Sequence, residues 1–123
     1  MQRPLKIVSR DFSLTDPIED QIRKHAEALE TFFDHLTGCD IVIEAPAVHH
    51  HRKGGPFNVR IILHVPRTQL TVNHQHAEDL SVAVRDAFDA ARRKLEDYVR
   101  ELRGDVKSHT TAAELTKTSI KKN

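Results

Sequence analysis

The sequence has very little cysteine and no long apolar run. Cys39 is the only cysteine in 123 residues, so no disulfide can form within the chain. A reducing compartment therefore fits best. No apolar run approaches the roughly 18–20 residues that cross a bilayer. The basic N-terminus is not followed by the apolar stretch of a secretory signal. We therefore expect a cytoplasmic protein without membrane contact.

The motifs of the common enzyme classes are also missing. The chain has no glycine-rich phosphate loop and no nucleophile elbow. Cys39 stands near the predicted start of a strand, where a lone cysteine is far more often a small buried hydrophobe than a nucleophile. We predict no catalytic residue, no cofactor and no small-molecule substrate, and therefore no enzyme.

A strong excess of positive charge is absent as well. The chain carries 19 basic and 18 acidic residues, a formal net charge of +1, whereas a dedicated nucleic-acid binder is often far more basic. Its 9 histidines titrate near neutrality. Attraction to RNA would therefore depend on local clusters of basic residues, or partly on protonated histidine.

The N-terminal third of the chain has the patterns of a strand followed by a helix. Alternating apolar residues predict a strand over residues 4–10. Asp16 suits an N-cap, Pro17 the first helical position and Glu19 a capping box. The helix that begins there is expected to run to about Leu36. Its apolar stripe consists of Ile18, Ile22, Ala26, Leu29 and Phe33.

Three strands and a second helix are predicted next. Apolar residues with a period of two predict strands over residues 40–45, 58–65 and 69–73, each with one buried and one wetter face. Asp79 is expected to cap a helix of about 24 residues, and Gly104 to end it.

The order of these elements predicts an α+β fold. A strand, a helix, three strands and a helix form a two-layer βαβββα sandwich, with a four-stranded mixed sheet and both helices on one face. The first two strands are parallel if adjacent, and the others antiparallel. We expect one domain over residues 1–107 and a disordered tail over residues 108–123.

The most unusual stretch is the loop 46–56, which holds three consecutive histidines and two basic residues. These are His49, His50, His51, Arg52 and Lys53. Adjacent histidines point in opposite directions, so at most two would share one metal, and no zinc motif supports a site. We predict no metal. Two interpretations of the loop remain. It is either a cationic loop that faces phosphate or a solvated loop with no dedicated role.

Arginines are frequent on the last helix, on the side opposite its apolar stripe. They are Arg85, Arg92, Arg93, Arg100 and Arg103. The first helix adds Arg23 and Lys24. Such side chains grip phosphates when a helix docks on RNA. Asp89 and Glu96 stand among them, which is equally typical of an ordinary charged helix surface.

Several short stretches recur in a recognisable order over residues 3–107. They are Leu5-Lys6-Ile7, Leu14-Thr15, Leu29-Glu30, Phe33-Asp34-His35, Leu63-His64-Val65, and Glu78-Asp79 ahead of the helix that holds Arg93 and Leu95. In this order and spacing they resemble the ribosome hibernation-promoting factor family, also called ribosome-associated inhibitor A or protein Y. The chain ends soon after the second helix, so the resemblance is to the short form.

The resemblance implies a fold similar to double-stranded-RNA-binding domains and a partner, the small ribosomal subunit. The expected site is the channel where mRNA and tRNA lie, so the protein would block translation in idle ribosomes under stress. Arg93 matches the family pattern. Ala28 and Ala90 stand where basic residues are usual, so neighbouring positions would have to supply that charge. We expect a monomer in isolation.

The predicted rRNA-binding residues come from the first strand, both helices and the histidine-rich loop. They are Lys6, Arg23, Lys24, Arg85, Arg92, Arg93, Lys94, Arg100, His50, Arg52 and Lys53. An alternative hypothesis is a regulatory protein-interaction module of the sigma-factor modulation type, which would dock a protein partner on the open sheet face. A weaker one is a metal-responsive domain built on the three histidines.

Overall fold

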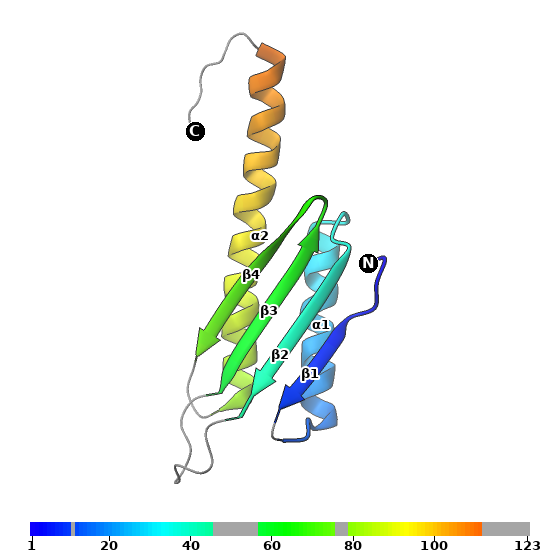
Figure 1. The fold of residues 1–123 in the computed structure, drawn as a ribbon, viewed down its shortest axis with the longest axis vertical. Helices are drawn as coiled ribbons and strands as arrows, with labels where there is room; N and C mark the ends of the chain where they lie inside the picture. The colour runs from blue at the N-terminus through cyan, green and yellow to red at the C-terminus, as the bar shows by residue number, and fades with distance from the viewer. Residues whose placement is uncertain (11, 46–56, 76–78, 112–123) are drawn as a thin grey trace. The chain divides into compact units, whose positions relative to one another are not determined.

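The described residues form two helices and four strands, arranged as Figure 1 shows. The computed structural model describes residues 1–10, 12–45, 57–75 and 79–111, and only the backbone of residues 74, 75 and 105–111. The elements in chain order are β1 (Lys6–Arg10), α1 (Asp16–Phe32), β2 (Gly38–Glu44), β3 (Asn58–Val65), β4 (Thr68–Gln75) and α2 (Leu80–Thr111). This order confirms the predicted βαβββα architecture.

The chain divides into two compact units, Met1–Arg92 and Arg93–Asn123. The first unit contains the sheet, α1 and the beginning of α2, whereas the second begins within α2. The proposed single domain over residues 1–107 and the disordered tail remain predictions. Residues 112–123 lie outside the described part.

The four strands form one open sheet in the order β1-β2-β3-β4. β1 and β2 are parallel, with Ile7 opposite Ile41. β2 and β3 are antiparallel, as are β3 and β4, so Ile41 faces Ile61 and Ile61 faces Val72. Both predicted strand directions are therefore confirmed.

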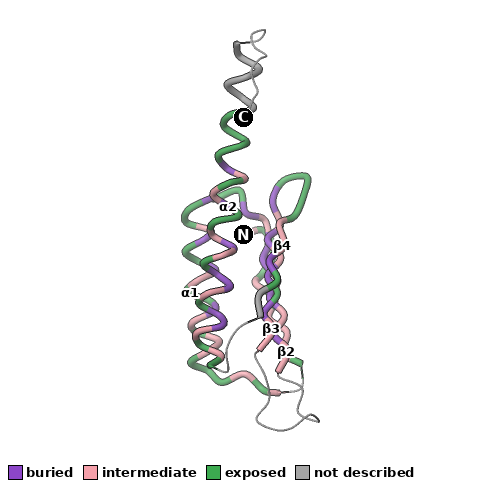
Figure 2. The backbone as a smooth tube through the Cα atoms, turned by 90° about the vertical axis from the view of Figure 1, so that its left-hand side faces the viewer, coloured by how far each residue is buried: buried purple, intermediate pink, exposed green. Residues whose placement is uncertain are grey.

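One face of the sheet is covered by α1 and the beginning of α2 (Figure 2). Every second residue of the central strands is buried on that face, which follows from the period of two. Each fully buried large aliphatic side chain stabilises the fold by about 1.5–3 kcal/mol. The largest buried side chains of the first unit are Ile22, Leu36, Ile41, Ile43, Ile61, Leu63, Val59, Val84 and Cys39.

The ends of α1 differ from the prediction. Thr15 is the N-cap, with an extended backbone and no side-chain hydrogen bond, so the assignment of Asp16 as the cap was wrong by one residue. Asp16 and Glu19 lie in the first turn, where carboxylates favour the positive end of the helix dipole. The helix ends at Phe32 rather than near Leu36, because Phe33 is extended (φ −139°, ψ 100°). Both Phe33 and Leu36 still reach the core from this non-helical segment.

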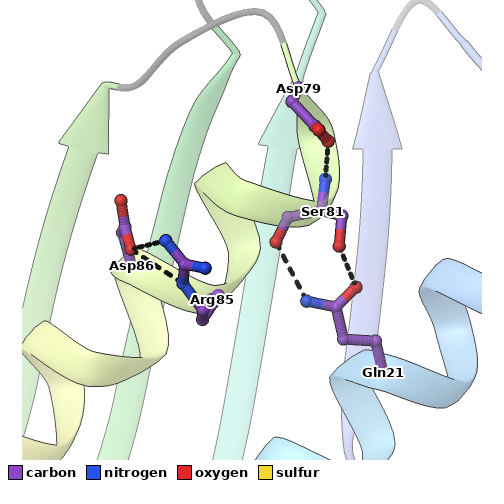
Figure 3. A network of polar contacts seen from close by, with 5 residues as sticks. All are labelled: Gln21, Asp79, Ser81, Arg85 and Asp86. Atoms are coloured by element: carbon purple, nitrogen blue, oxygen red, sulfur yellow. Dashed lines mark hydrogen bonds and ion pairs between the residues drawn. The ribbon is translucent and has the colours of Figure 1, made fainter.

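The start of α2 agrees with the prediction and its end does not. Asp79 Oδ1 accepts a hydrogen bond from the backbone N–H of Ser81 at 3.0 Å, which confirms the predicted cap (Figure 3). The helix continues through Gly104 to Thr111. Gly104 does not adopt the positive φ of a helix-ending glycine. Within a helix a glycine costs only about 1 kcal/mol relative to alanine, so glycine alone does not end one.

Candidate nucleic-acid interface

A polar clamp joins α1 to the first turn of α2 (Figure 3). The side-chain amide of Gln21 donates to the carbonyl oxygen of Ser81 at 2.9 Å. The hydroxyl of Ser81 donates in return to Gln21 Oε1 at 3.0 Å. Because Asp79 caps the same turn, the clamp holds this end of α2 in a fixed register against α1.

His25 and Phe88 form the next contact between the helices. Their rings are stacked, with centroids 4.9 Å apart and an interplanar angle of 13°. Burial lowers the pKa of His25, and the nearby carboxylate of Asp89 only partly opposes this shift. Near neutral pH His25 is therefore an uncharged aromatic contact, not a cation for phosphate.

Phe32 and Arg92 form the third contact. The guanidinium carbon of Arg92 lies 4.4 Å from the centroid of the Phe32 ring, a cation–π geometry. Phe32 is 37% exposed, although it is a large hydrophobic residue. Residue numbers rise together through the three contacts, so α1 and this part of α2 run in the same direction.

Three predicted RNA-binding residues of the first unit lie along this helix pair. Lys24 on α1 and Arg85 on α2 fall between the first two contacts, and Arg92 makes the third. Lys24 is exposed and forms no ion pair with any described residue. Arg85 is exposed and pairs with Asp86 at 3.2 Å (Figure 3).

Two other predicted residues of the first unit lie elsewhere. Arg23 is about 200° around α1 from both Gln21 and His25, on the flank away from α2. Lys6 pairs in register with Asp40, whose neighbours in β2 are buried under the helices, so Lys6 lies on the open sheet face. The structure therefore does not place Lys6 or Arg23 beside Arg85 or Arg92.

The second unit carries the remaining predicted residues of α2. Arg93, Lys94 and Arg100 are all exposed. Arg100 donates to Asp97 at 2.8 Å. Arg93 and Lys94 have no ion-pair partner in the described part of the chain. Since seven residues correspond to nearly two helical turns, Arg93 and Arg100 share one line of the helix.

The histidine-rich loop lies outside the described residues, so the predictions for His50, Arg52 and Lys53 are untested. The same holds for the metal hypothesis on His49 and His51. Within the described ranges, no three histidine, cysteine or acidic side chains come together as a possible metal ligand set.

The open sheet face carries charges of both signs. Asp40 and Glu44 each have a partner there, whereas Lys6 and Arg60 form no ion pair with a described residue. Arg10 pairs with Glu44 at 3.3 Å, and His64 lies 3.0 Å from Asp40. A shallow hollow of about 150 Å³ is lined there by Arg10, Val42, Glu44, Asn58, Arg60 and Asn73. This mixture of charges does not favour a polyanion over a protein partner.

The reasoning from sequence missed four contact residues of the helix pair, which are Gln21, His25, Phe32 and Ser81. Phe32 had a usable signal, because it is a large apolar residue one position away from the stripe that contains Phe33. A bulky apolar side chain outside the buried stripe is either a contact to another element or a binding residue. The partner of His25 depends on tertiary packing, and no local pattern identifies it.

The comparisons with known proteins agree with the fold. The sequence model of one family, described as sigma 54 modulation protein / S30EA ribosomal protein, matches residues 5–103. A ribosomal subunit interface protein from Coxiella burnetii is similar in structure, with a TM-score of 0.65 and 10% identity over 78% of this chain and 97% of that one. The Protein Y N-terminal domain of Thermus thermophilus is also similar in structure, with a TM-score of 0.58 and 19% identity. The match covers 76% of this chain and 94% of that one. The search of curated proteins found no match. None of the described helices combines the length and the apolar character of a membrane span.

Proposed function

The chain belongs to the sigma 54 modulation protein / S30EA ribosomal protein family of ribosome-associated proteins, and on that premise we propose that it binds the rRNA of the small subunit. Its site is the channel that mRNA and tRNA occupy. Bound there as a cytoplasmic monomer, it blocks translation in idle ribosomes and catalyses no reaction. The observation that carries this proposal is the family match over residues 5–103, because a net charge of +1 alone would not indicate RNA.

The exposed basic side chains of the helices support the proposal. Lys24, Arg93 and Lys94 project into solvent without an ion-pair partner among the described residues. Phosphate oxygens accept charge-assisted hydrogen bonds, which are roughly twice as strong as neutral ones. These three side chains are therefore suited to phosphate contacts that fix the protein on RNA without reading its sequence.

Arg85 and Arg100 are available to RNA despite their ion pairs. Each pairs with a carboxylate on the same helix, at 3.2 Å to Asp86 and 2.8 Å to Asp97. Exposed pairs of this kind contribute only about 0.2–1 kcal/mol. A phosphate can replace such a carboxylate at little cost.

The direct test is co-sedimentation with purified small subunits over a series of salt concentrations. We expect log affinity to fall linearly with log salt, with a slope set by the number of phosphates neutralised. Replacing Arg92, Arg93 and Arg100 together by glutamine should weaken binding and flatten that slope by roughly two to three. Absence of co-sedimentation even at low salt would reject the proposal.

A matched control removes the same charge outside both helices. Arg10, Arg60 and Arg67 lie in strands β1 and β3 and in the β3–β4 turn, and none belongs to the proposed site. Their combined replacement by glutamine should leave the salt slope within error of the native protein. Equal losses in the two triple variants would show that net charge, rather than the helices, drives binding.

A protein-docking role of the open sheet face is the second candidate. It is favoured by Val8, Val42 and Ile62, which are apolar and only half-buried on that face. Nuclease treatment of a pull-down discriminates the two functions. Partners that disappear with the RNA favour the ribosome, and partners that persist favour protein docking.

A further inference from the structure

We propose that Phe32 and Arg92 form a stacking site for one unpaired RNA base on the helix pair of the first unit. The inference rests on the proposed function and adds the chemistry by which a nucleotide is held. Such a site is distinct from the phosphate contacts of the basic side chains, because phosphate contacts need only positive charge.

The exposure of Phe32 is the first observation. Among the described residues only Phe32 and Leu102 are large hydrophobic side chains with this much surface in solvent, at 37% and 43%. Phe32 lies outside the buried stripe of α1, so the core does not need it. Ala28, one turn earlier on the same side of α1, is also exposed, and its methyl group extends little beyond the backbone.

The position of Arg92 is the second observation. Its guanidinium is held 4.4 Å from the ring centroid of Phe32, and part of its surface remains in solvent. Contact with the ring restricts a side chain that would otherwise sample many rotamers, so less entropy is lost when a ligand binds. Bases of RNA stack on aromatic side chains and on guanidinium planes alike. Because the guanidinium already covers one face of the ring, the pair offers the outer face of the guanidinium, backed by the ring, to the base of a nucleotide.

The chemistry of the pair selects an unpaired nucleotide. Bases inside an A-form duplex are stacked on one another. Side chains cannot enter the major groove of such a duplex, which is deep and narrow. A base in a loop, bulge or single strand has a free face and gains from stacking on any π-surface, whatever its sequence. Its phosphate lies within reach of the same cation, with Lys24 and Arg85 further along the pair.

The experiment uses Phe32→Leu and Arg92→Lys in co-sedimentation with small subunits across a salt series. Phe32→Leu keeps an apolar side chain, and Arg92→Lys keeps the charge, so neither removes a cation. Both should weaken binding about 5- to 150-fold, as loss of one stacked base does. The slope of log affinity against log salt should stay unchanged, since no phosphate contact is lost. Leu102→Ala, which truncates the other exposed large apolar side chain of the described residues, should bind like the native protein.

The outcomes separate this inference from the proposed function. If the native protein does not co-sediment, the proposed function fails. If the native protein binds and either Phe32→Leu or Arg92→Lys binds equally well, the stacking site alone is rejected. Arg92→Lys also guards against misfolding, because a lysine on a helix surface preserves helix propensity. An equal loss in Leu102→Ala would assign the effect to apolar surface in general and would likewise reject the site.

Discussion

Cys39 lies in β2 with its side chain fully buried on the helix-covered face of the sheet. Burial, with a smaller contribution from Asp40, raises the pKa of the Cys39 thiol from 9.0 to about 12. The thiolate is the reactive form, so the folded protein should resist alkylation at mildly alkaline pH. We expect one equivalent of iodoacetamide to be incorporated only after denaturant is added, as measured by mass spectrometry. Rapid labelling of the folded protein would contradict this burial.

The same shift has a consequence for stability at high pH. A thiol whose pKa is raised in the folded state is neutral in both states below its ordinary value. Its contribution is therefore fully present below pH 9.0 and is lost as the pH rises toward about 12. This supports the sequence-based view of Cys39 as a small buried hydrophobe.

His25 predicts the opposite dependence on pH. Burial beside Phe88 lowers its pKa from 6.5, so the unfolded chain binds a proton more readily than the folded one. The free energy of unfolding should therefore fall as the pH drops below about 6.5 toward the lowered value, and this loss should be absent above it. Denaturant titrations of the native protein and of His25→Gln over this range test the prediction. Parallel pH profiles for the two proteins would show that His25 is not the group responsible.

At the scale of elements, the turn between β3 and β4 stores strain. Arg67 adopts a φ of 75°, in the left-handed region that favours glycine. A side chain in that region costs roughly 1–2 kcal/mol. Arg67→Gly should therefore raise the free energy of unfolding by about 1 kcal/mol, measured by urea denaturation. Arg67→Ala removes the same side chain but keeps the Cβ atom, so it should give no such gain. Equal stability of the two variants would argue against strain at this turn.

The ends of the helices show why element boundaries are difficult to infer from local pattern. The stripe that contains Phe33 continues past the helix, because an extended segment also turns Phe33 and Leu36 into the core. Gly104 is a residue type that often ends a helix, but it does not adopt the positive φ that would end this one. Hydrophobic spacing reports which side chains are buried, and the backbone that delivers them is decided by the neighbouring elements.

At the scale of the whole molecule, the charge balance limits non-specific binding. With a net charge of +1, the protein should bind a generic polyanion only weakly. We expect elution from heparin at no more than about 0.3 M salt near neutral pH. Retention should increase near pH 6, where some of the 9 histidines become protonated. Retention at neutral pH to roughly 1 M salt would mean that bulk charge attraction outweighs specific contacts.

Much of the molecule was determined by the sequence alone. The period of two in the strands, the stripe on each helix and the Asp79 cap are local properties of the chain, and they specified the βαβββα order and the strand directions. The family followed from short stretches in a fixed order over most of the chain, and the match over residues 5–103 confirms it. Local spacing also identified the basic side chains of α2 that lie opposite its apolar stripe.

Only the tertiary structure decided which of those side chains share a surface. Arg23 and Lys24 are adjacent in sequence, yet a step of about 100° puts Arg23 on the flank away from α2 and Lys24 on the solvent side of α1. Lys6 belongs to the opposite face of the sheet, because its register with Asp40 fixes its side. The Phe32–Arg92 contact joins residues that lie far apart in the chain. Periodicity describes the faces of one element, whereas a binding surface depends on the register and direction of two packed elements, which long-range contacts set.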